Sequence, residues 1–150
     1  FVSNNYNSTT CTTAKAQCPD ISSALNISES YGNIFVRPGV YSGTGNANLC
    51  IGACVGLEGL TISGLGPPSQ VLLLSSGTPF ADSIALYIYE NTVTAISNIT
   101  FQGFINPVST EPNKVGAIEI VRSDVRFEHV IFQNNSGILG GAIHATNSNA

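Results

Sequence analysis

The feature that most constrains the fold of this chain is an internal repeat. Residues 85–104 align with residues 117–136: Phe101 falls on Phe132, 31 positions later. Other apolar residues recur after 32 positions, in the pairs Ala85 with Ala117, Leu86 with Ile118, Ile88 with Ile120 and Val93 with Val125. A third copy begins with Gly141, Ala142 and Ile143, 25 positions after Gly116, Ala117 and Ile118. Repeats of this length are typical of solenoids, in which each coil stacks on the next to bury its apolar face.

The local period inside each copy is two residues. In Ile118-Glu119-Ile120 and in Ile99-Thr100-Phe101, apolar side chains alternate with polar ones, which is the pattern of a strand with one buried face. Gly, Asn, Ser and Pro separate such runs, and looser versions of the same strand and turn occupy residues 33–43 and 59–66. We therefore predict coils of two or three short strands.

One segment has the spacing of a helix. Residues 19–32 place Ile21, Ala24, Leu25 and Ile27 at near-helical intervals, with Asp20 as N-cap and Gly32 as the stop. A short helix at this point would cover the apolar end of a solenoid. The expected organisation is a strand and disulfide segment over 1–18, a capping helix over 19–32 and β-helix coils over 33–150, which continue or stack beyond Ala150.

Charge and hydropathy exclude several classes of protein. Only 9% of residues are charged and 43% are hydrophobic, so the chain has enough apolar material to fold. Five Lys and Arg against nine Asp and Glu do not form the basic surface that binds nucleic acid. The longest apolar run, 71–74, is far shorter than the ~20 residues of a membrane-spanning helix.

The cysteines favour disulfides over a metal site. Cys11, Cys18, Cys50 and Cys54 form no C-x-x-C pair, and both histidines lie far downstream, so no metal site is predicted. The short-range pairs Cys11–Cys18 and Cys50–Cys54 fit better than the crossed pairings, which stay open. Disulfides point to an extracellular or cell-surface location.

Sequons for N-linked glycans agree with that location. Four asparagines stand in Asn-x-Ser/Thr: Asn7, Asn26, Asn98 and Asn134. The last two border predicted strands, where the chain would meet solvent. We expect glycans at these sites and no other cofactor.

Two stretches resemble known β-helix proteins. DISSALNISESYGNIFVRPGVYSG is similar to the entry of right-handed parallel β-helix proteins of the pectin-lyase-like superfamily, where an amphipathic helix leads to a strand ending in Pro-Gly-x-Tyr, here Pro38 to Tyr41. FQNNSGILGGAI is similar to the repeat of polymorphic outer-membrane proteins of bacteria and of protist surface proteins, F-x-x-N followed by G-G-A-I. The resemblance covers most of residues 19–150. It implies an all-β fold, a right-handed parallel β-helix (solenoid) with a short N-terminal capping α-helix, and it says little about activity.

The β-helix gives individual residues expected roles. Phe132 would stand in an inward column, where a change to alanine costs about 3–5 kcal/mol if the side chain is fully buried. Gly140 and Gly141 would lie at a corner, with positive φ or a crowded backbone. Asn135 would bend the chain and bond main-chain groups.

Acidic residues do not form a catalytic pair in the sequence. Enzymes on this fold need clustered carboxylates, but the aspartates are separate: Asp20, Asp82 and Asp124. We assign no catalytic residue. The repeat aligns Tyr87, Glu119 and His144 on one outward face, ~4.8 Å apart, as a possible ligand-facing strip, although ordinary solvent-facing residues are the favoured interpretation. A second polar group, expected to be a solvated turn with ion pairs, comprises Arg122, Arg126, Glu128 and His129.

These observations together predict an extracellular structural surface glycoprotein without enzymatic activity. An uncovered last coil would match the first coil of another copy, so the chain is expected to be a protomer of a head-to-tail filament, with residues 1–10 as a free strand that adds to a neighbour's edge. The alternatives are a fragment of a polysaccharide-active lyase or hydrolase, and a carbohydrate-binding adhesin domain. The expected partners are further copies of the chain and glycans.

Overall fold

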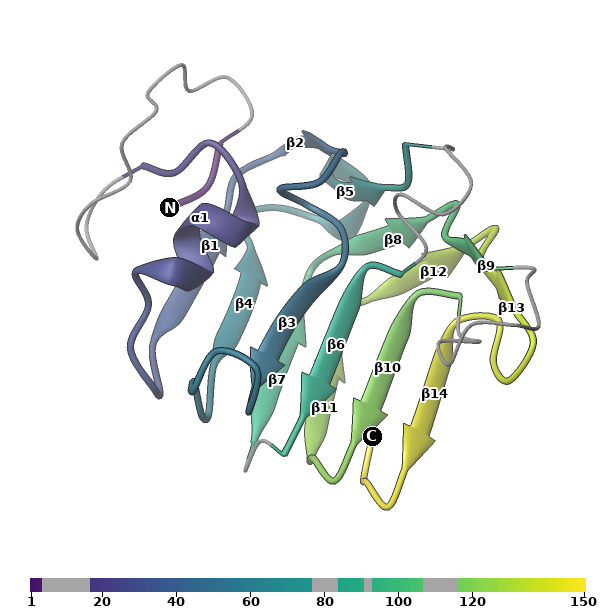
Figure 1. The fold of residues 1–150 in the computed structure, drawn as a ribbon. Helices are drawn as coiled ribbons and strands as arrows, with labels where there is room; N and C mark the ends of the chain where they lie inside the picture. The colour runs from purple at the N-terminus through teal and green to yellow at the C-terminus, as the bar shows by residue number, and fades with distance from the viewer. Residues whose placement is uncertain (4–16, 77–83, 91–92, 107–115) are drawn as a thin grey trace.

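The computed structural model is a parallel β-helix with one short α-helix at its N-terminal end (Figure 1). The structure describes residues 1–3, 17–76, 84–90, 93–106 and 116–150. Three sheets of four parallel strands form the sides of the solenoid, and a two-stranded sheet lies at one corner. The predicted fold class is therefore confirmed, with parallel pairing in every sheet.

Each coil contributes one strand to each sheet. Sheet A contains β1 (Asn33–Val36), β4 (Thr61–Gly64), β7 (Thr94–Ser97) and β11 (Val125–Glu128). Sheet B contains β2 (Gly39–Tyr41), β5 (Val71–Leu74), β8 (Thr100–Gln102) and β12 (Ile131–Gln133). Sheet C contains β3 (Leu49–Gly52), β6 (Leu86–Tyr89), β10 (Ile118–Val121) and β14 (Ile143–Thr146). The smaller pair is β9 (Ile105–Asn106) with β13 (Ser136–Gly137), and a 3-10 turn, η1 (Pro68–Gln70), precedes β5.

The strand register follows the sequence repeat with one exception. Ile118 pairs with Leu86 and with Ile143, as the spacings of 32 and 25 predict, and Phe132 pairs with Phe101. Val125, however, pairs with Thr94 and not with Val93, which is 55% exposed. The bounds of the strands explain the error, because one more residue separates β6 from β7 than separates β10 from β11.

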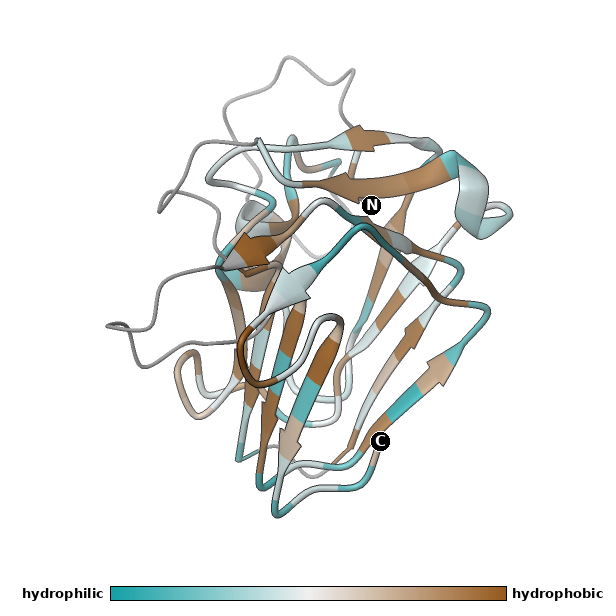
Figure 2. Ribbon diagram, turned by 90° about the vertical axis from the view of Figure 1, so that its right-hand side faces the viewer, coloured by the Kyte–Doolittle hydropathy of each residue, from teal (hydrophilic) through white to brown (hydrophobic). Residues whose placement is uncertain are grey.

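The core consists of inward columns that run along the solenoid. In sheet B the column is Tyr41, Leu73, Phe101 and Phe132, and in sheet C one column is Leu49, Leu86, Ile118 and Ile143. Alternate residues point outward, so hydrophobic and hydrophilic residues alternate along the strands in Figure 2. This arrangement is the physical reason for the period of two, since successive side chains of a strand point to opposite faces.

Residues in the left-handed backbone conformation, with positive φ, form the corners between the sheets. Glu90, Arg122 and Asn147 follow the sheet C strands of successive coils with φ of 49°, 47° and 52°. Gly103 and Asn134 hold the equivalent position after sheet B, with φ of 76° and 54°. Asparagine and glycine are the residues that adopt this conformation most readily. The chain therefore turns at Asn134 and not at Asn135, where the bend was predicted, and neither Gly140 nor Gly141 has a positive φ.

Gly140 is required because the backbone is crowded there. Its φ is not positive, but a Cβ at this position would lie 2.4 Å from the carbonyl oxygen of Ile143. Gly116 is crowded in the same way, since a Cβ there would lie 1.8 Å from the carbonyl oxygen of Gly141. Crowding is therefore the reason for Gly140. Gly141, for which the same role was predicted, has neither property: its φ is not positive, and a Cβ there would meet its nearest neighbour, the carbonyl oxygen of Asn135, at 3.4 Å.

The helix α1 (Ile21–Asn26) lies against β1 and β3 at the N-terminal end of the solenoid (Figure 1). Asp20 is its N-cap and accepts a hydrogen bond of 2.7 Å from the backbone N–H of Ser23. The predicted stop at Gly32 is wrong, because the helix ends at Asn26 with Ile27 as the C-cap. The helix is therefore shorter than the segment predicted over 19–32.

Val2 extends sheet A by one strand position beyond β1, at the N-terminal end of the solenoid. It pairs in parallel with Val36 and with Cys18, and it is fully buried. Its N–H donates to the carbonyl of Phe35 at 2.8 Å, and its carbonyl accepts from the N–H of Arg37 at 3.0 Å. The expectation of a free N-terminal strand is therefore wrong for residues 1–3, while residues 4–10 lie outside the described part of the chain.

Burial falls sharply in the last coil. Phe101 is 1% exposed and Ile96 is 1% exposed. Their partners one coil later, Phe132 and Phe127, are only partly buried, as is Ile143. On the far side of this coil Asn149 pairs in parallel with Asp124, just before β11. Among the described residues no further strand stacks on β11, β12 or β14, so the inward columns end in a surface that is partly apolar.

Candidate functional site

The predicted outward strip exists as a continuous row of side-chain positions on sheet C. Tyr87, Glu119 and His144 are paired neighbours on β6, β10 and β14, and Cys50 on β3 extends the row. Each lies between two inward residues of its strand, so each points to the outer face. The alignment inferred from the repeat is confirmed. Whether the strip binds a ligand stays a prediction.

Tyr89 belongs to this surface, although the strip predicted from the repeat did not include it. Its ring stacks on that of Tyr87 with centroids 6.1 Å apart, and its hydroxyl donates to Glu119 Oε2 at 3.1 Å. Burial raises the pKa of Tyr89 to about 12, and the charge and hydrogen bond of Glu119 act in the same direction. The signal was present in the sequence, because two tyrosines separated by one residue of a strand share a face.

His144 lies at the other end of the row. Its ring is half-buried, and its Nδ1 atom is buried without a hydrogen-bond partner among the described residues. Its Cβ lies 3.5 Å from the position that a Cβ of Gly140 would take. This is an ordinary contact distance, so Gly140 is required by the backbone of Ile143 and not by His144.

A disulfide borders the strip at β3. Cys50 and Cys54 are bonded to each other, as predicted, and an open hollow lies beside them with Ala53, Tyr89 and Glu90 in its wall. Cys18 is also disulfide-bonded, and Cys11 lies outside the described residues. The hollow and the tyrosine pair give sheet C an outer surface that combines aromatic rings, a carboxylate and an imidazole.

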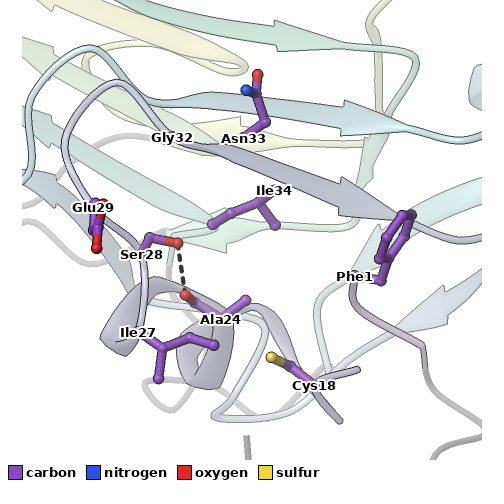
Figure 3. A pocket seen from close by; sticks show the side chains of 9 residues that line it. All are labelled: Phe1, Cys18, Ala24, Ile27, Ser28, Glu29, Gly32, Asn33 and Ile34. Atoms are coloured by element: carbon purple, nitrogen blue, oxygen red, sulfur yellow. Dashed lines mark hydrogen bonds between the residues drawn. The ribbon is translucent and has the colours of Figure 1, made fainter. Parts of the chain in front are cut away.

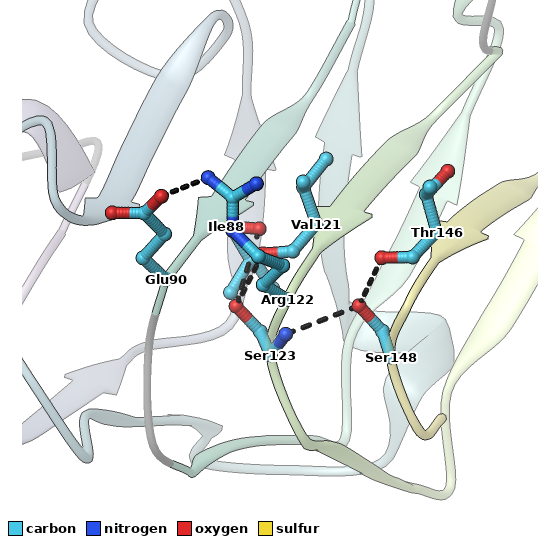
Figure 4. Close-up of polar contacts among 7 residues, drawn as sticks. All are labelled: Ile88, Glu90, Val121, Arg122, Ser123, Thr146 and Ser148. Carbon is cyan, nitrogen blue, oxygen red and sulfur yellow. Dashed lines mark hydrogen bonds and ion pairs between the residues drawn. The ribbon is translucent and has the colours of Figure 1, made fainter.

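Polar contacts between successive coils stabilise the corner that follows the strands of sheet C (Figure 4). Arg122 forms an ion pair with Glu90 of the preceding coil. The buried hydroxyl of Ser123 donates to the carbonyl of Val121 at 2.9 Å, and Ser148 of the next coil accepts from the N–H of Ser123 at 3.1 Å. These contacts satisfy the backbone where the chain leaves sheet C, so they support the position of the strip.

The second predicted polar group separates into two parts. Arg122 belongs to the corner just described, whereas Arg126 and Glu128 form an exposed pair at 3.5 Å on the outer face of β11. His129 occupies a left-handed corner position with φ of 52°. Pairs as exposed as these contribute little to stability, which agrees with the expectation of a solvated turn.

The acidic residues named from the sequence are not gathered. Asp20 caps α1, and Asp124 accepts a hydrogen bond from the side chain of Asn149 at 2.7 Å. Asp82 lies outside the described residues. Within the described ranges, no group of three or more His, Cys, Asp or Glu side chains is placed to hold a metal ion.

Two of the four sequons are exposed in the structure. Asn26 ends α1 and Asn134 lies at a corner, and both are exposed, whereas Asn98 is half-buried at another corner. Asn7 lies outside the described residues. Among the helices that the structure describes, none is both long and apolar enough to cross a membrane.

Comparison of the chain with protein-family models, with curated proteins and with solved structures finds no match.

Proposed function

We propose that this chain is a non-enzymatic structural module of an extracellular glycoprotein, and that it assembles by covering its last β-helical coil with another coil. The contrast in burial between equivalent residues carries this proposal. Phe101 and Ile96 are 1% exposed, but Phe132 and Phe127 are only partly buried. A further coil would bury these rings and pair the outer edges of β11, β12 and β14.

The resemblance of the two sequence stretches supports a place among pectin-lyase-like β-helices of the surface-protein type. We further propose that the protein is secreted or lies at the cell surface and that it carries N-linked glycans. The disulfide between Cys50 and Cys54 supports this location, because disulfides persist in oxidising compartments.

The form of the assembly depends on the N-terminal end of the solenoid. A head-to-tail filament requires Val2 and α1 to leave β1, because they cover that end. In a closed dimer, the last coils of two copies contact each other, and Val2 and α1 stay in place on β1. The two forms differ in symmetry, since head-to-tail contacts repeat without limit and a twofold contact closes.

The test is sedimentation and electron microscopy of the purified chain with three lysine variants on sheet B. Ile131→Lys charges the last strand, Val40→Lys charges the first strand in the same outward column, and Gln102→Lys is the matched control on an interior strand. Lysine on an edge strand opposes edge pairing. Loss of assembly in both edge variants supports the filament, and loss in Ile131→Lys alone supports the closed dimer. A wild-type chain that stays monomeric at every concentration would refute the proposal.

The tyrosine surface favours a second candidate function, passive binding of glycans on sheet C. Tyr87 and Tyr89 present stacked rings beside the carboxylate of Glu119, and tyrosine combines an apolar face with a polar end. A panel of glycans and pectins tests it with Tyr87→Ala as the variant. Binding without turnover that is lost in Tyr87→Ala supports an adhesin. Turnover that is lost in Glu119→Gln would make the chain a carbohydrate-active enzyme instead.

A further inference from the structure

Two hollows of the structure differ in how well they suit a ligand. A cavity of about 130 Å³ lies between α1 and β1 (Figure 3). It is smaller than the about 300–1,000 Å³ of most small-molecule sites, and the hydroxyl of Ser28 in its wall already donates to the carbonyl of Ala24 at 2.7 Å. The open hollow beside the disulfide of Cys50 and Cys54 measures about 410 Å³, which is within that range. The outer face of sheet C is therefore the better candidate for a ligand.

This hollow is continuous with the tyrosine pair of sheet C. Tyr89 forms part of its wall, and Cys50, also in the wall, is the strand neighbour of Tyr87. The rings of Tyr87 and Tyr89 stack with centroids 6.1 Å apart. Ala53 and the disulfide add further apolar surface. Tyrosine rings pack well against ligands that have both apolar faces and polar groups, so an extended ligand can lie across the two rings and enter the hollow.

Glu119 brings a negative charge to the same surface without a cation to balance it. Its side chain is half-buried, and its Oε2 atom accepts a hydrogen bond from the hydroxyl of Tyr89 at 3.1 Å. No ion pair joins Glu119 to a residue that the structure describes, including its neighbour His144 on β14. The described arginines lie elsewhere: Arg122 pairs with Glu90, Arg126 pairs with Glu128, and Arg37 lies over the ring of Phe1.

The carboxylate and the first ring are direct neighbours. Glu119 on β10 pairs with Tyr87 on β6, and adjacent strands lie about 4.8 Å apart. An ammonium group placed between the two side chains contacts both, because an aromatic face attracts cations and a carboxylate accepts a charge-assisted hydrogen bond. A ligand that carries a carboxylate would instead bring a second negative charge next to Glu119. The charge of the surface therefore favours a cationic ligand over an acidic one.

We propose that the outer face of sheet C binds glycans through a charged amine, so that its ligand is an amino sugar such as glucosamine and not a uronic acid such as that of pectin. The ammonium group donates to Glu119 and lies on the ring of Tyr87, while the next sugar ring packs on Tyr89 and enters the hollow. This inference rests on the glycan binding proposed above and names the class of ligand.

The test is isothermal titration calorimetry of the full 150-residue chain with four sugar tetramers, at a pH at which the sugar amine is protonated. The tetramers of glucosamine, N-acetylglucosamine and glucose differ in one substituent of each ring, and the tetramer of galacturonic acid carries carboxylates. We expect the glucosamine tetramer to bind about tenfold more tightly than the others or better, since tenfold corresponds to about 1.4 kcal/mol and a hydrogen bond to a charged group contributes at least about that much. Added salt should reduce the preference.

Three variants separate the charge from the rings. Glu119→Gln keeps an acceptor for the hydroxyl of Tyr89 but removes the charge, so the glucosamine tetramer should bind no better than the glucose tetramer. Tyr87→Ala should weaken the binding of every sugar that binds, because it removes packing surface. Glu128→Gln removes an exposed carboxylate from the outer face of β11 in sheet A. It is the control for overall charge and should leave the preference for glucosamine unchanged.

The outcomes distinguish this inference from the function on which it rests. Equal binding of the four tetramers, or tighter binding of galacturonic acid, would overturn the inference and leave glycan binding in place. No binding of any tetramer would refute both. An unchanged preference in Glu119→Gln would overturn the assigned partner of the amine. Tetralysine, which carries amines without sugar rings, should bind more weakly than the glucosamine tetramer; equally tight binding would overturn the sugar as the occupant.

Discussion

The side-chain oxygen of Asn135 accepts a hydrogen bond of 3.0 Å from the backbone N–H of Phe104, one coil earlier. The amide nitrogen of Asn135 donates to the carbonyl of Phe101 at 3.0 Å. One carboxamide thus satisfies two backbone groups at the corner where sheet B ends. Phe104 holds the equivalent position of its own coil and is fully buried, so the same corner is built once from an apolar ring and once from an amide.

Replacing Asn135 with alanine should therefore destabilise the chain. The change leaves a backbone donor and a backbone acceptor unsatisfied in a partly buried corner, which costs about 1–3 kcal/mol. Chemical denaturation followed by circular dichroism measures the loss. Gln133→Ala, at an exposed position two residues away, is the control and should change the free energy of unfolding by less than about 0.5 kcal/mol. Equal effects of the two changes would contradict the assigned role.

The two stacked phenylalanines should differ in their contribution to stability. Phe101 and Phe132 are ring neighbours with centroids 5.4 Å apart, but Phe101 is buried and Phe132 is only partly so. We expect Phe101→Ala to cost about 3–5 kcal/mol and Phe132→Ala to cost clearly less in the dilute chain. Urea denaturation of both variants measures the difference. A cost for Phe132→Ala as large as that for Phe101→Ala would show that the last coil is already covered.

The stability of the chain should fall at alkaline pH through Tyr89. Its pKa is raised from 10.0 to about 12 in the folded chain, so between these values the folded state holds a proton that the unfolded state has lost. The contribution is complete below pH 10 and disappears as pH rises towards 12. Ultraviolet titration of tyrosinate should show one residue ionising last. In Glu119→Gln its pKa should fall, because the carboxylate charge is removed; an unchanged titration would rule out the Glu119 contact.

Glycan occupancy should differ among the described sequons. Asn26 and Asn134 are exposed, whereas Asn98 is half-buried and the hydroxyl of Thr100 in its sequon is engaged by the carbonyl of Pro68 at 2.8 Å. We expect Asn26 and Asn134 to carry more glycan than Asn98 when the chain is secreted from a eukaryotic host. Glycopeptide mapping gives the occupancies. A fully occupied Asn98 beside an empty Asn134 would contradict the placement of these corners.

Much of the fold could be predicted because the β-helix repeats one physical rule. Inward residues must stack on inward residues, so the spacing of Leu86, Ile118 and Ile143 along the chain is enough to determine the register of sheet C. The Asp20 cap and the Cys50–Cys54 pair were predictable from local chemistry. The candidate strip followed from the same register, apart from Tyr89.

The errors occur where local sequence does not determine the outcome. The register of Val93 was wrong because one more residue separates β6 from β7 than separates β10 from β11, so the spacing of 32 in sheet C becomes 31 in sheet A. The pairing of Val2 with Val36 joins residues far apart in the sequence. Residues 1–3 are too few to show a periodicity from which this pairing could be predicted. Glycine at 140 reflects a close approach to Ile143, a contact that exists only in the folded coil.

Amide hydrogen exchange at the rim of the last coil tests the central claim most directly. The alternation of bonds to β7, β8 and β10 leaves the N–H groups of Phe127, Phe132 and Ile143 directed away from the preceding coil. If another coil covers this rim, these three amides exchange rapidly in dilute solution and slowly in concentrated solution, while the Phe101 amide is protected throughout. Rapid exchange at every concentration, or protection already present in a dilute monomer, would contradict the account.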